Sequence, residues 1–167
     1  MLVDGETKVI ESFAILDYLE AAYPSPALMP ADAAAIGTVR MVQMVTLNEL
    51  LTALAPLTRK MMGFDNPDQA TVEKAQQQTM KVLQFCQDKL AGQLWYGGDQ
   101  VTLAEMVLGT VTPWLTQMEV DLADVPEIQD WTQRLMARQA WQMTQPTEAA
   151  IAAFRDRMRQ LMAQRQG

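Results

Sequence analysis

The residues best suited to ligand chemistry are Glu11 and Ser12, which stand together where a predicted strand gives way to a predicted helix. Serine is a favoured N-cap residue, because its hydroxyl accepts a hydrogen bond from the free amides of the first helical turn. Those amides and the helix dipole also attract anions. Ser12 is therefore suited to a ligand carboxylate and Glu11 to an ammonium group, which together make the head group of an α-amino acid. From these two residues alone, the simpler interpretation that they only begin the helix stays open.

The rest of the composition excludes several kinds of catalytic centre. The 167 residues include one cysteine, Cys86, and no histidine. Histidine-based catalytic pairs and histidine-ligated metals are therefore excluded, and we expect no bound metal. An internal disulfide needs a second cysteine, so the composition fits a reducing compartment. Cys86 lies on a mixed face of a predicted helix, and we expect it to be buried and unreactive.

Charge and hydropathy restrict the partners and the location. The net charge of −7 opposes binding to nucleic acid and to anionic lipid. No apolar run approaches the ~20 residues that cross a bilayer, and the N-terminus lacks the pattern of a signal peptide. The sequence thus predicts a cytoplasmic protein without nucleic-acid or membrane partners. Four arginines near the C-terminus have the spacing of one solvated helix face: Arg155, Arg157, Arg159 and Arg165.

A hairpin and a helix are predicted at the N-terminus. Residues 1–10 hold two short apolar runs on either side of Asp4-Gly5, a pair that favours a tight turn. Apolar residues then recur at helical spacing over residues 13–23, and two prolines end that helix. Because a two-stranded sheet with one helix is too small to be stable in water, this stretch looks like the end of a larger sheet.

Beyond Pro30 no strand pattern appears, and the apolar spacing predicts five helices. Thr102 and Glu105 have the spacing of a capping box at the start of the third helix, which is a structural role. The five helices are expected over about 31–62 with a bend near Pro56, 67–90 with Asp65 or Asn66 as cap, 103–119 with a kink at Pro113, 126–138, and 147 to the C-terminus.

Three segments, in the same order, resemble the cytosolic glutathione transferases. Residues 2–20 contain strand-Asp-Gly-strand and then Glu-Ser-x-Ala-Ile-x-x-Tyr-Leu, which is similar to the glutathione-binding motif of that family. Residues 95–106 resemble the approach to the central helix of the family's C-terminal domain, although the family usually has Asp at the position of Glu105. Residues 125–141, with Trp131 inside, resemble a late-helix pattern of the same family.

The resemblance implies a mainly α fold with two parts. Residues 1–25 correspond to the C-terminal remnant of a thioredoxin-like glutathione-binding domain, and residues 30–167 to an all-helical C-terminal domain. It also implies glutathione as co-substrate, an apolar electrophile as second substrate, and a homodimer as assembly. In the family, the residues that match Glu11 and Ser12 contact the γ-glutamyl part of glutathione.

The resemblance assigns no catalytic residue to this chain. The Tyr, Ser or Cys that activates the glutathione sulfur belongs to a part of the family's sequence that nothing here matches. We therefore expect the chain alone not to run conjugation efficiently. The alternative function is a non-catalytic, transferase-like helical module for binding or assembly, and a free-standing bundle with a vestigial hairpin is a third.

Met41, Met44 and Asn48 follow one another at intervals of about one helical turn. In the family, the equivalent helix lines the electrophile pocket, and flexible thioethers suit an apolar pocket that accepts varied ligands. The competing interpretation is that these methionines only fill the core.

Overall fold

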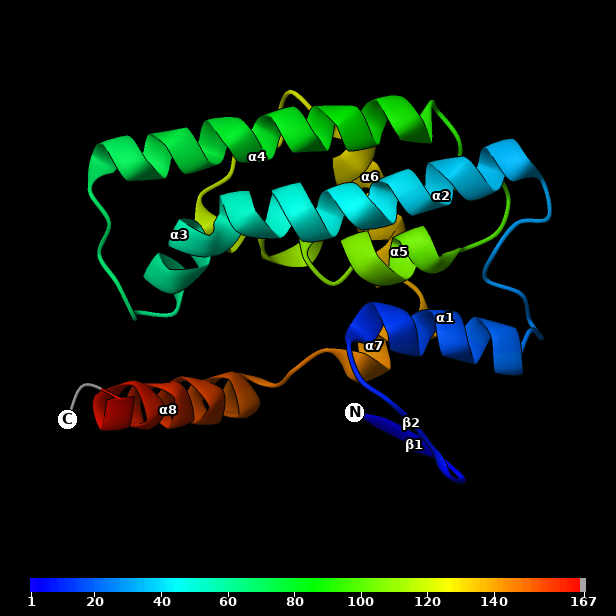
Figure 1. Ribbon diagram of the computed structural model, residues 1–167. Coiled ribbons are helices and arrows are strands. Elements are labelled where there is room, and N and C mark those ends of the chain that lie inside the picture. Colours follow the sequence, from blue (N-terminus) through cyan, green and yellow to red (C-terminus); the bar gives the residue numbers. More distant parts are fainter. Residues whose placement is uncertain (166–167) are drawn as a thin grey trace.

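A two-stranded hairpin and one helix form the N-terminal unit of the computed structural model, which describes residues 1–165 (Figure 1). Strand β1 (Leu2–Asp4) pairs antiparallel with β2 (Thr7–Val9). Gly5 has a φ of 57° in the turn, where a side chain would be strained. Helix α1 (Ser12–Ala22) follows directly. The predicted hairpin and first helix are confirmed.

A body of helices makes up the rest of the described chain. Helix α2 (Ala33–Val45), a π-helical segment η1 (Thr46–Leu50) and helix α3 (Leu51–Met61) run in succession, and the long α4 (Gln69–Leu90) packs along them (Figure 1). The remaining elements are α5 (Leu103–Leu108), the 3-10 turns η2 (Thr112–Trp114) and η3 (Thr116–Met118), α6 (Pro126–Met136), α7 (Gln139–Thr144) and α8 (Glu148–Arg165). The mainly α fold class is therefore confirmed.

The core lies inside this helical body. Within residues 1–165, the buried apolar side chains all fall between Val39 and Leu135, and Trp131 is the largest that is fully buried. The N-terminal unit adds only the half-buried Leu16 at the margin of this core. No helix of this part of the chain has the length and apolar character needed to cross a membrane.

Several predicted helix ends are wrong. The cap of α4 is Asp68, whose side chain accepts from the Thr71 N–H at 2.7 Å, whereas Asp65 forms an ion pair with Arg59. The predicted third helix stops after six residues, at Leu108, and two 3-10 turns follow it. Pro113 lies at the start of the first of these turns and does not kink a longer helix.

The bend expected near Pro56 lies elsewhere in the structure. The irregular part of the α2–α3 rod is the π-helical segment η1, which lies before Pro56, and Pro56 itself sits inside α3. The short helix α7 was not predicted.

Arg155 does not lie on the predicted solvated face. Its guanidinium is half-buried and donates to the Met61 carbonyl at 3.4 Å. The side chain of Arg165 and residues 166–167 lie outside the described part of the chain.

Candidate functional site

Glu11 and Ser12 lie at the junction between β2 and α1, and both are exposed. Ser12 is the first residue of α1, so it is not the N-cap that the sequence predicted. Glu11 occupies the cap with φ 68° and ψ 127°, and no side-chain hydrogen bond caps the helix. The carbonyl of Glu11 accepts the first helical hydrogen bond, from the Ile15 N–H at 3.0 Å. The helix therefore begins one residue earlier than it would with Ser12 as its cap.

The backbone of Glu11 is strained, because a positive φ is unusual for a residue with a side chain. Strain of this kind persists where the surrounding structure imposes it and is frequent at ligand-binding sites. It turns the chain sharply from strand to helix and leaves the first amides of α1 without side-chain partners. Free amides and an exposed carboxylate therefore lie next to each other, which is the arrangement that an α-amino-acid head group needs.

The hairpin is fixed to α1 by a three-residue contact. The Asp4 carboxylate accepts from the phenols of Tyr23 at 2.6 Å and Tyr18 at 2.9 Å. These two hydrogen bonds, the one from Tyr23 foremost, lower the pKa of Asp4 below its ordinary value. The same contact with Asp4 raises the pKa of both phenols. The carboxylate therefore stays ionised at neutral pH and holds β1 against the helix that begins at Ser12.

A mostly apolar cavity of about 400 Å³ opens beside Ser12. It lies between the N-terminal unit and the helical body. Its lining is Ser12, Phe13, Ile15 and Leu16 from α1, Thr46, Leu47 and Leu51 from η1 and α3, and Met106, Val107, Thr110 and Val111 from α5 and the turn after it. The cavity has the composition of a site for an apolar group, with hydroxyls at a few points.

Met41, Met44 and Asn48 are exposed and do not line this cavity. The side chains of Met41 and Met44 are 41% and 40% exposed, so the interpretation of these two methionines as core filler is wrong. Both methionines lie on α2, and Asn48 lies on η1.

Cys86 takes no part in a site. It is fully buried as a free thiol in α4, as the sequence predicted. Burial raises the pKa of its thiol from 9.0 to about 12. The thiol is therefore neutral at physiological pH and is not a nucleophile there.

Glu105 is the centre of a buried hydrogen-bond network. It forms the predicted capping box with Thr102 at the start of α5. Its carboxylate also accepts from the Tyr96 N–H at 2.8 Å and from the Trp131 indole at 3.3 Å. The spacing of Thr102 and Glu105 identifies the capping box, but the partners at Tyr96 and Trp131 come from other segments and had no sequence signal.

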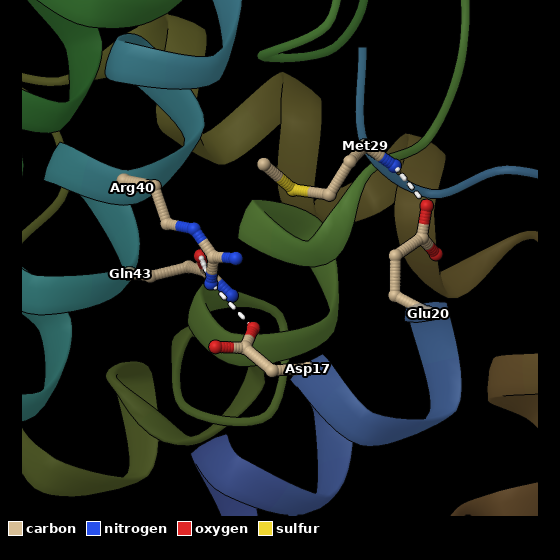
Figure 2. Close-up of polar contacts among 5 residues, drawn as sticks. All are labelled: Asp17, Glu20, Met29, Arg40 and Gln43. Carbon is tan, nitrogen blue, oxygen red and sulfur yellow. Dashed lines mark hydrogen bonds and ion pairs between the residues drawn. The ribbon is translucent and has the colours of Figure 1, made fainter. Parts of the chain in front are cut away.

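A second set of polar contacts, which the sequence did not indicate, joins α1 to the helical body (Figure 2). The Glu20 carboxylate accepts from the backbone amides of Leu28 and Met29, and Asp17 pairs with Arg40 at 2.6 Å. Partners separated by 23 residues leave no local pattern in a sequence.

The known proteins that this chain is similar to agree on one family. A family model described as "Glutathione S-transferase, C-terminal domain" matches residues 52–139. Maleylacetoacetate isomerase of Rattus norvegicus is 29% identical over 148 residues, and the match covers 86% of this chain and 65% of that protein. Glutathione S-transferase 3 of Zea mays is 31% identical over 152 residues, and the match covers 86% of this chain and 68% of that protein. The chain thus spans less than two thirds of the length of the rat isomerase.

Solved structures of similar fold include glutathione transferases. The bacterial enzyme BphK, solved as a ternary complex, superposes with a TM-score of 0.70 at 22% identity, covering 92% of this chain and 72% of that one. A glutathione S-transferase of Methylobacterium radiotolerans, solved with glutathione sulfonate, gives a TM-score of 0.68 at 25% identity, covering 83% and 66%.

The residues that match the family model run from α3 to the start of α7, so the helical body is a transferase-type C-terminal domain. The family model covers more than half of the chain, and a relative at 31% identity is matched over two thirds of its length. This chain belongs to the glutathione S-transferase family.

Proposed function

We propose that this chain carries the head-group anchor and the apolar wall of a glutathione-dependent enzyme that transfers glutathione to electrophilic small molecules. The observation that carries the proposal is the strained junction at Glu11 and Ser12, which presents free helix amides and a carboxylate at the mouth of an apolar cavity. The relative named as a glutathione S-transferase supports this reaction class.

Each residue of the anchor has a distinct role in this proposal. The Glu11 carboxylate binds the ammonium of the γ-glutamyl group, and the Ser12 hydroxyl with the first amides of α1 binds its carboxylate. Glutathione, when bound, supplies a thiolate nucleophile. No residue of this chain is assigned the activation of that thiol, so we expect negligible conjugation by the 167 residues alone. The measurement is turnover of glutathione with a chlorinated aromatic acceptor.

Several further features belong to the same proposal. Residues 1–25 are the remnant of a thioredoxin-like domain and residues 30–167 the helical domain, which fits the open edges of the two-stranded sheet. The exposed surface at Met41, Met44 and Asn48 contacts the electrophile or a second copy in a homodimer. The protein acts in the cytoplasm.

Binding of glutathione tests the anchor directly. We expect millimolar glutathione to shift the amide NMR signals of residues 11–14 in the chain as it exists, with only weak retention on immobilised glutathione. Glu11→Gln should weaken this binding about tenfold, because a charged hydrogen bond is lost, and Ser12→Ala should weaken it less. Glu6→Gln, an exposed change in the hairpin turn, is the control. Equal binding by Glu11→Gln and Glu6→Gln would refute the anchor.

A non-catalytic helical module is the second candidate, and it is favoured by the position of the buried apolar core, which lies entirely within the helical body in the described residues. The genomic sequence upstream of Met1 distinguishes the two. An in-frame continuation with Tyr, Ser or Cys after a first strand supports the enzyme, whereas an in-frame stop there supports the module.

A further inference from the structure

The first contact that holds α1 in place is made by the carboxylate of Glu20. Its two oxygens accept from the Leu28 amide, each at 3.1 Å. One of them also accepts from the Met29 amide at 2.9 Å, the contact that Figure 2 draws. The carbonyl of Leu28 in turn accepts from the Leu103 N–H at 2.9 Å, at the first residue of α5. The carboxylate on α1 is thereby connected through the loop to the start of a buried helix.

The second contact is centred on Arg40 of α2. Its Nη1 donates to Asp17 on α1 at 2.6 Å and to the side-chain oxygen of Gln43 at 3.2 Å. Figure 2 shows the Arg40 guanidinium between these two side chains. Gln43 is fully buried, and its amide nitrogen has no hydrogen-bond partner within the described residues. A buried amide therefore orients Arg40 from the side of the body, and the paired carboxylate lies on the side of α1.

Apolar packing leaves much of the orientation of α1 undetermined. No residue of α1 is fully buried, and Leu16 lies only at the margin of the core. The cavity of about 400 Å³ occupies part of the same interface. Directional polar contacts fix an angle between two elements more narrowly than a partly empty apolar interface does.

We infer that Glu20, Asp17 and Arg40 form a two-point clamp that sets the position of the hairpin–α1 unit, and with it Glu11 and Ser12, on the helical body. The clamp residues are positioning residues and do not touch the ligand. Asp17 and Glu20 lie five and eight residues along α1 from Ser12, about 8 and 12 Å at 1.5 Å per residue. Loss of either contact lets the unit open separately while the helical body stays folded. The link to glutathione rests on the proposed function; the clamp itself does not.

Amide hydrogen exchange on the full chain, read residue by residue, tests the clamp. In Glu20→Gln we expect the amides of residues 16–23 to exchange about tenfold faster, which is the change expected when a charge-assisted hydrogen bond is lost. In Arg40→Met the increase should be about two- to fivefold, because the ion pair is half-exposed. Amides of α4 should keep their protection in both variants. Arg40→Lys should recover part of the protection of α1.

Arg59→Met is the matched control, since it removes another exposed Arg–Asp pair, the one with Asp65. It should leave exchange in α1 unchanged. Equal exchange in α1 for the wild type and both clamp variants would overturn the inference, and so would a parallel loss of protection in α4, which would indicate general destabilisation.

Glutathione titrations of the same samples separate the clamp from the proposed function. We expect binding to weaken at least threefold in Glu20→Gln and Arg40→Met and to stay unchanged in Arg59→Met. If the wild type binds no glutathione while exchange in α1 still rises in the variants, the proposed function fails and the clamp stands. If binding is unchanged although α1 opens, the positioning of Glu11 and Ser12 by the clamp is refuted.

Discussion

At the scale of single residues, the stability of the helical body depends heavily on one buried carboxylate. Glu105 accepts from two backbone amides, the Thr102 hydroxyl and the Trp131 indole, and its side chain is inaccessible to water. Glu105→Ala should lower the free energy of unfolding by about 3–5 kcal/mol, since several buried donors lose their acceptor at once. Urea denaturation measures this. Glu49→Ala, at an exposed position of η1, should change stability by under about 0.5 kcal/mol.

Cys86 gives a second prediction at this scale. Because burial raises its pKa to about 12, the folded protein should not react with a thiol reagent at pH 8, and it should react fully in denaturant. The folded state holds this proton more tightly than the unfolded state does. The contribution of this raised pKa to the free energy of unfolding is therefore fully present below pH 9, and it is lost as the pH rises from about 9 to 12. Labelling of native protein at the rate of a free thiol would contradict the burial of Cys86.

At the scale of elements, a glycine sets how closely α5 and α6 approach. A Cβ on Gly109 would collide with the backbone carbonyl of Glu105 and with the side chain of Leu135 in α6. Gly109→Ala should therefore cost about 1–3 kcal/mol of stability. Gly37 lies inside α2 with open space around it, so Gly37→Ala should stabilise by about 0.5–1 kcal/mol through helix propensity. Thermal unfolding followed by circular dichroism compares the two, and similar effects of both substitutions would refute the close approach.

At the scale of the whole molecule, the helical body should fold without the N-terminal unit. The buried apolar side chains lie between Val39 and Leu135, and the unit contributes chiefly Leu16. A chain without residues 1–24 should therefore keep a single cooperative thermal transition, with a loss of about 2–4 kcal/mol from the contacts of Leu16, Glu20 and Asp17 with the body. A chain of this kind that lacks a cooperative transition would show that the unit belongs to the folding core. Size-exclusion chromatography distinguishes such a failure from aggregation.

Features that depend on neighbouring residues were determined by the sequence itself. Asp4-Gly5 indicated the hairpin, the apolar spacing over residues 13–23 indicated α1, and the Thr102–Glu105 spacing indicated the capping box. The motif around Glu11 and Ser12 was sufficient to indicate the family. In each case the decisive groups lie within a few residues of one another, where backbone geometry alone brings them together.

Only the tertiary structure decided the features that join distant segments. These include the half-burial of Arg155 against Met61, the cavity beside Ser12, and the contact of Glu20 with Leu28 and Met29. Helix ends such as the Asp68 cap also depended on it, because several nearby residues could cap α4 and the packing of the loop selected one. Such contacts depend on how whole faces pack together, and their partners lie too far apart along the chain to leave a periodic signal.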